Sequence, residues 1–174
     1  MPGHIQVQEL RNLDFSIGKV RVRAAIANHP GICVGYRVYT SQGSIVYMPD
    51  NEPALPSHIA IKGSKETDTK AMARSRDEKM TEFFDGADVL ILDSQYDQQE
   101  YQSHNHWGHA CVDDAVSLAL KAKVKKLFLF HHDPDHSDGK ITALVDHARQ
   151  IVKREGASLV VEAAREGVSL NLGD

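Results

Sequence analysis

The stretch ADVLILD, residues 87–93, is a nearly continuous run of apolar residues that ends on a carboxylate. A short run of this kind is typical of a strand that is buried on both faces of a parallel sheet. Upstream, apolar and charged residues alternate over Val20–Ile26, which is the period-2 pattern of a half-buried strand. The first part of the chain, up to Tyr47, is therefore interpreted as β structure that precedes the buried strand.

Helical and strand patterns alternate through the rest of the chain. The predicted helices cover residues 67–84, 112–122 and 139–155. The predicted strands cover residues 125–130, 158–163 and 168–172. Residues 51–63 contain prolines and show no periodicity, so they are predicted to form a surface loop. This alternation predicts a mixed α/β fold, and residues 1–174 are expected to form a single domain because no linker or repeat divides them.

The composition is that of an ordinary soluble domain. The 174 residues are 41% hydrophobic and 25% charged, and a chain of this length buries about 70% of its unfolded surface without needing disulfides. The net charge of -4 and the lack of a basic run give no indication of nucleic-acid binding. Cys33 and Cys111 lie outside any C-x-x-C pattern, and no stretch resembles a signal peptide or a membrane span. We expect a cytoplasmic protein without membrane contact.

Polar side chains stand at the ends of the predicted strands. Asp50, Asp93 and His131 each follow an apolar strand, and His29 follows the strand that ends at Ile26. Because a rigid scaffold presents strand ends at a common edge, we expect these side chains to form a site. Mixed imidazole and carboxylate ligands suit Zn, Mn or Fe, often as two ions about 3.5–4 Å apart that share a carboxylate. Asp50 is the natural bridging ligand.

Most of the ten histidines fall in two clusters. In HHDPDHSD, residues 131–138, His132 is a secondary metal-ligand candidate, although the polar residues at the end of this segment can simply cap the following helix. In HNHWGH, residues 104–109, the spacing H-x-H-x-x-H would allow His104 and His106 to approach a metal. Glycine, however, occupies the position where a further acidic ligand would be wanted. The alternative for this second cluster is a solvent-exposed loop that leads into the next helix.

Taken together, these segments resemble the C-terminal half of a metallo-β-lactamase-fold hydrolase. The similarity is greatest to the phosphodiesterase-like branch, which includes cyclic phosphodiesterases and the tRNA 3′-processing endonucleases. The matching segments occur in the family order and are NHPG (28–31), VYMPD (46–50), ADVLILD (87–93), WGH (107–109) and LFLFHHDPDHSD (127–138). The resemblance implies an αββα sandwich, in which two similar halves each contribute a mixed sheet with helices outside.

The resemblance also implies a role for each matching residue. It makes His29, Asp50 and His131 metal ligands, with Asp50 as the bridging carboxylate. Asp93 and His109 match the carboxylate and histidine pair that assists proton transfer beside the metals in the RNA-processing relatives. The implied cofactor is one or two divalent ions, with Zn as the first choice and Mn or Fe as alternatives.

One family motif is missing. The first motif of the family, H-x-H-x-D-H, lies on the N-terminal half of the domain, and nothing before His29 resembles it. The likeness of residues 104–109 to this motif is judged coincidental. Much of the N-terminal half is therefore expected to be absent from the chain. Because soluble monomers rarely leave a large apolar face uncovered, we expect a homo-oligomer or association with a separate N-terminal half.

Three functional hypotheses follow from these observations. The first is a dinuclear metallohydrolase that cleaves a small phosphodiester or a similar substrate. The second is a catalytically inactive half-domain that serves as a binding, regulatory or oligomerisation module. The third is thiol chemistry at Cys111, since a predicted helix start there can lower the thiol pKa, although such a cysteine is more often a buried packing residue.

Overall fold

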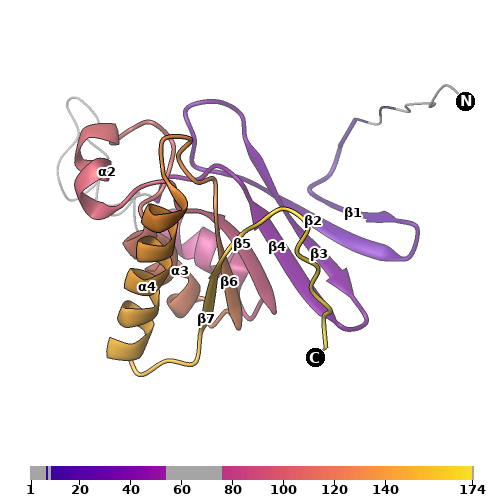
Figure 1. Ribbon diagram of the computed structural model, residues 1–174. Helices are drawn as coiled ribbons and strands as arrows, with labels where there is room; N and C mark the ends of the chain where they lie inside the picture. The colour runs from indigo at the N-terminus through magenta and orange to yellow at the C-terminus, as the bar shows by residue number, and fades with distance from the viewer. Residues whose placement is uncertain (1–6, 8, 54–75, 174) are drawn as a thin grey trace, which may run out of the picture.

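The computed structural model describes residues 7, 9–53 and 76–173, which contain one mixed sheet in the order β1-β2-β3-β4-β5-β6-β7 (Figure 1). The strands are β1 Asp14–Ile17, β2 Val20–Ile26, β3 Val34–Thr40, β4 Gly43–Met48, β5 Val89–Asp93, β6 Lys126–Phe130 and β7 Val160–Ala163. The pairs from β1 to β4 are antiparallel. The pairs from β4 to β7 are parallel, so β4 is the strand at which pairing changes from antiparallel to parallel.

Two helices cover one face of the parallel strands. These two helices are α3 Val112–Lys121 and α4 Asp138–Arg154. The chain also forms the short helix α2 Gln98–His104, and residues 76–84 are helical. α3 contacts α4, β5 and β6, and α4 contacts β7, as Figure 1 shows. Val46, Leu90 and Leu127 lie in the core on this side of the sheet and are 0% exposed. Full burial of a side chain of this size contributes about 1.5–3 kcal/mol, so this layer supplies much of the stability.

The other face of the sheet is partly exposed. By the register of the ladders, Ile26, Tyr47 and Val160 lie on it, and 63%, 39% and 46% of their surface is exposed. The segment after β7, yellow in Figure 1, leads toward the antiparallel strands, and Gly173 approaches Gln42 in the turn between β3 and β4. The described residues thus provide one sheet with its helices, which corresponds to one half of an αββα sandwich.

Most of the predicted elements are present. The helices predicted at 112–122 and 139–155, and the strands predicted at 87–93, 125–130 and 158–163, are confirmed to within two residues at each end. The predicted helix at 67–84 is confirmed over residues 76–84, and the rest of it lies outside the described residues, as do residues 54–63 of the predicted loop. Among the described residues, no helix is long and apolar enough to cross a membrane.

Two features of local structure differ from the sequence-based expectation. The strand predicted at 168–172 is wrong, because Gly167 adopts φ 76° in a turn after β7, and Val168 beyond it pairs with no strand. The helix α2 is not predicted, although its start carries a usable signal. The Asp97 carboxylate accepts from the Glu100 amide while the Glu100 carboxylate accepts from the Asp97 amide. This reciprocal pair is a capping box. In a sequence, a capping box is recognised as a residue with an acceptor side chain followed three positions later by Glu, and it indicates the start of a helix.

Candidate metal centre

Three neighbouring parallel strands end at candidate site residues. Asp93 is the last residue of β5, Asp50 follows the end of β4 by two residues, and His131 directly follows β6. His131 has a left-handed backbone, with φ 60°, which redirects the chain as it leaves the strand. Because the carboxyl ends of parallel strands meet at one edge of the sheet, side chains far apart in sequence converge there.

Asp50, His109 and His131 form a compact cluster, the ligand group. Each residue offers one ligand atom, and these atoms lie within 4.8 Å of one another. Nδ1 of His131 is 3.2 Å from Oδ1 of Asp50, and the rings of His109 and His131 stack with their centroids 4.5 Å apart. Within the described ranges this is the only such cluster of His, Cys, Asp and Glu. One carboxylate and two imidazoles form a donor set that fits Zn, Mn or Fe.

Asp93 orients the His109 ring. The Asp93 side chain is completely buried, and its Oδ2 accepts a hydrogen bond from His109 Nδ1 at 2.7 Å. Burial raises the pKa of Asp93 even though this hydrogen bond opposes the shift. The hydrogen bond to Asp93 raises the pKa of His109 against the opposing effect of burial. Because Nδ1 is committed to Asp93, Nε2 is the ring atom of His109 that remains for a metal or a substrate.

His29 lies beside the ligand group rather than within it. The centroid of its ring is 5.6 Å from that of His109, and its Nδ1 accepts a hydrogen bond from the amide of Gly31 at 3.1 Å. The Nε2 atom of His29 is therefore the one available for an ion. Gly108 presses closely on this ring, since an added Cβ there would lie 2.3 Å from His29 Cδ2.

The structure does not bring the three secondary histidine candidates into the ligand group. His104 Nδ1 donates to the carbonyl of Glu100 at 2.7 Å, and its ring stacks on Tyr96 with the centroids 4.5 Å apart. His106 is exposed, and His132 is partly buried in the segment after β6, where burial lowers its pKa. The assignment of these three residues as ligands stays a prediction.

The two cysteines have different environments. Cys33 donates a hydrogen bond from Sγ to Oδ2 of Asp50 at 3.2 Å. Cys111 is completely buried at the N-cap of α3, and burial raises the pKa of its thiol. A raised pKa disfavours the thiolate, so this environment does not favour thiol chemistry at Cys111. Glu52, which the sequence reasoning does not identify, is also a buried charged residue.

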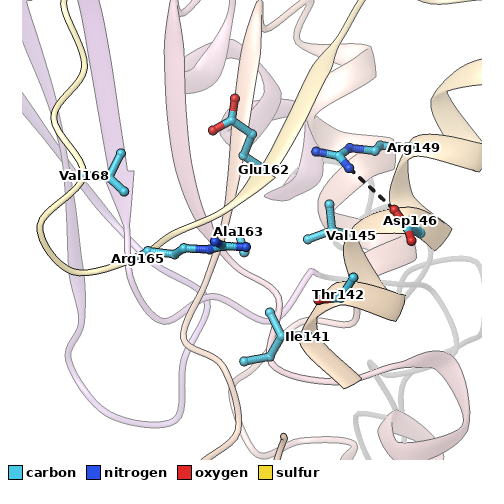
Figure 2. A pocket seen from close by; sticks show the side chains of 9 residues that line it. All are labelled: Ile141, Thr142, Val145, Asp146, Arg149, Glu162, Ala163, Arg165 and Val168. Atoms are coloured by element: carbon cyan, nitrogen blue, oxygen red, sulfur yellow. Dashed lines mark hydrogen bonds and ion pairs between the residues drawn. The ribbon is translucent and has the colours of Figure 1, made fainter. Parts of the chain in front are cut away.

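Two pockets differ in their relation to the ligand group. One, of about 370 Å³, is lined by His29 together with Arg76, Asp77 and Lys79. Another, of about 280 Å³, lies between α4 and β7, and Figure 2 shows the side chains from both elements around it. None of the candidate site residues lines the pocket between α4 and β7. The pocket beside His29 therefore borders one of the predicted site residues.

Curated proteins are similar to parts of this sequence, whereas no protein-family profile matches it. The chain is 39% identical over 72 residues to ribonuclease Z of Picrophilus torridus, covering 41% of the chain and 23% of that protein. It is 28% identical to ribonuclease Z of Treponema denticola in an alignment that covers 84% of the chain and 57% of that protein. The chain thus spans from about a quarter to just over half of the length of these relatives.

Solved structures share the arrangement of strands and helices at low sequence identity. The metallo-β-lactamase fold protein YhfI from Bacillus subtilis matches with a TM-score of 0.63 and 18% identity, over 89% of the chain and 51% of that protein. The short form of human tRNase Z matches with a TM-score of 0.57 and 16% identity, over 92% of the chain and 46% of that protein. These similarities confirm the predicted fold class. The chain covers about half of each of these two solved structures.

Proposed function

We propose that this chain, a member of the metallo-β-lactamase superfamily, carries part of the active site of a metal-dependent hydrolase that cleaves phosphodiester bonds. The observation that carries this proposal is the ligand group of Asp50, His109 and His131 at the ends of the parallel strands. The relatives named ribonuclease Z and tRNase Z support a phosphodiester as the bond that is cleaved.

In this proposal, His29, Asp50 and His131 hold one or two divalent ions, with Zn as the first choice and Mn or Fe as alternatives. Such an ion supplies a Lewis acid and lowers the pKa of water. The carboxylate of Asp50 would be the ligand available to both ions if two are bound. The thiol of Cys33 donates to Oδ2 of Asp50 and so restrains the carboxylate in the orientation that faces His131.

His109 and Asp93 are proposed to handle the proton. Asp93 fixes the His109 ring through Nδ1, which leaves Nε2 to carry the proton, and the ring itself lies in the ligand group with Asp50 and His131. An imidazolium in this position can protonate the leaving oxygen of a phosphodiester, and the buried carboxylate stabilises the positive charge of the ring. The pair therefore supplies a general acid next to the proposed metal ligands.

The substrate class is proposed to be an RNA or a smaller phosphodiester. The net charge of -4 gives no indication of nucleic-acid binding, but the charge of a whole chain does not describe a local pocket. Arg76 and Lys79 line the pocket beside His29 and offer cations to phosphate oxygens, next to the acidic Asp77. The relatives named as ribonucleases favour RNA between these two possibilities.

Association with a second copy, or with a separate N-terminal half, is part of the same proposal. The exposed apolar side chains of Ile26, Tyr47 and Val160 on the sheet face opposite α3 and α4 favour such contact. A cytoplasmic location is likewise proposed from the cysteine pattern in the sequence.

The test is turnover of bis-p-nitrophenyl phosphate and of a short RNA by the purified chain with added Mn or Zn. We expect a rate above the control with metal alone, lost in Asp50→Ala and retained in His104→Ala, because the His104 ring is engaged by Glu100 and Tyr96. Equal losses in the two variants would contradict the assignment of the site.

A wild-type rate equal to the control would favour the second candidate, a non-catalytic binding or oligomerisation module. One observation supports that candidate: the exposed apolar side chains of Ile26, Tyr47 and Val160 lie on the sheet face opposite α3 and α4 and offer a surface for association.

A further inference from the structure

Glu52 is a buried carboxylate that receives three hydrogen bonds from one segment of the chain. The residue is 6% exposed. Its Oε1 accepts from the Tyr101 hydroxyl at 2.7 Å and from the His106 amide at 2.8 Å, and its Oε2 accepts from the Gly108 amide at 2.9 Å. A buried carboxylate is costly unless it is hydrogen-bonded, so these donors are what permit it to lie there.

The shape of the loop at residues 104–109, the histidine loop, matches this carboxylate. His106 and Gly108 both have left-handed backbones, with φ 71° and 96°. Backbone in such conformations turns successive amides toward one concave side and creates a site for an anion. In this protein the anion is supplied internally by Glu52. The carboxylate is thereby committed to the histidine loop and is not placed to bind an ion.

Glu52 also ties the histidine loop to the two other segments of the site. Its amide donates to the carbonyl of Asn28 at 2.8 Å, and its carbonyl accepts from the Asn28 side chain at 2.6 Å. Asn28 directly precedes His29, and Glu52 itself follows Asp50 by two residues. One residue therefore joins the segments that carry His29, Asp50 and the histidine loop.

We propose that Glu52 is a positioning residue, whose carboxylate holds the histidine loop so that His109 faces Asp50 and His131. Asp93 fixes the rotation of the His109 ring, whereas Glu52 fixes the backbone from which that ring projects. The inference rests on the proposed function in so far as a divalent ion binds beside the histidine loop, at His29, Asp50 and His131. The position of the histidine loop does not depend on a bound ion, and it is measured separately, by hydrogen exchange at the loop amides.

The test compares Glu52→Gln with Glu162→Gln in the full chain. Glutamine keeps the size of the side chain but turns an amide group toward at least one of the three donors. We expect hydrogen exchange at the His106 and Gly108 amides to accelerate at least tenfold, and the affinity for Zn or Mn, measured by calorimetry, to fall about tenfold. Glu162 is a partly buried carboxylate of β7 paired with Lys126, away from the ligand group, so its variant is expected to behave as wild type.

Two further variants separate positioning from folding. Tyr101→Phe removes one donor and leaves both loop amides bonded to Glu52, so its losses should be smaller than those of Glu52→Gln. Glu52→Asp keeps the charge on a shorter side chain and decides the question if Glu52→Gln does not fold. All measurements are made where circular dichroism shows a folded chain, so that a change in affinity without a change in secondary structure reports on positioning.

Unchanged exchange at the loop amides together with wild-type metal affinity, in whichever Glu52 variant folds, would overturn the proposal. If the wild-type chain binds neither Zn nor Mn, the proposed function fails. The role of Glu52 is then decided by two measurements on its variants: hydrogen exchange at the loop amides, and the position of the His109 ring signals in NMR spectra. Faster loop exchange with displaced His109 signals would support positioning, and unchanged spectra would overturn it.

Discussion

Replacing Gly108 by alanine tests how tightly the histidine loop packs against His29. Gly108 has φ 96°, and an added Cβ would lie 2.3 Å from His29 Cδ2 and 2.5 Å from Pro30 Cδ. A left-handed backbone costs a residue with a Cβ about 1–2 kcal/mol. Forcing packed groups apart costs about 1–3 kcal/mol more. We therefore expect the free energy of unfolding to fall by about 2–5 kcal/mol, which corresponds to a drop of roughly 4–20 °C in Tm for a chain of this size.

Gly156→Ala is the matched control, because Gly156 has φ 63° and no atom lies within 4 Å of the added Cβ. It carries the cost of the backbone without the clash. Thermal unfolding followed by circular dichroism should place Gly108→Ala below Gly156→Ala, and calorimetry with Mn should show weaker binding only for Gly108→Ala, since His29 is displaced. If Gly108→Ala unfolds at the same temperature as Gly156→Ala, the packing argument is refuted.

Three other expectations can be checked with single variants or reagents. Asp93→Asn preserves the shape of the side chain but removes its negative charge and replaces one acceptor oxygen with a donor, so the rate of phosphodiester cleavage should fall about 10²–10⁴-fold, and a change under threefold would contradict the assigned role of the pair. Hydrogen bonds from Lys125 and from a backbone amide hold the pKa of Asp88 below its usual value of 3.8. The stabilisation is therefore present above that value and lost as pH falls through the folded-state pKa. The free energy of unfolding in urea should be larger for wild type than for Asp88→Asn at about pH 7, and the two values should converge near pH 2. A difference that stays constant with pH would argue against the ion pair. Cys111, at 0% exposure, should react with a thiol reagent only after denaturation, and rapid labelling of the folded chain would contradict its burial.

The convergence of Asp50, Asp93 and His131 could be predicted because each residue ends a local pattern. An apolar run followed by a polar side chain identifies a buried strand and its end without reference to any other part of the chain. Once the strands are parallel neighbours, their ends must meet. The roles assigned to these residues came from the family resemblance and stay predictions.

Contacts that join distant segments could not be predicted in this way. Glu52 accepts a hydrogen bond from a tyrosine 49 residues away, and no local pattern marks either partner. The error at 168–172 has a related cause. Val168 and Leu170 alternate with polar residues as in an edge strand, but a strand also needs a neighbour to pair with, and the turn at Gly167 leads the chain away from β7.

His131 occupies a backbone conformation, φ 60°, that glycine adopts without penalty and that costs other residues about 1–2 kcal/mol. His131→Gly should therefore leave the fold at least as stable while deleting the imidazole beside Asp50. A sequence optimised for thermostability alone would discard this histidine. Under the proposed function, the histidine at the end of β6 exchanges stability for a metal ligand, as is common where backbone strain coincides with a functional site.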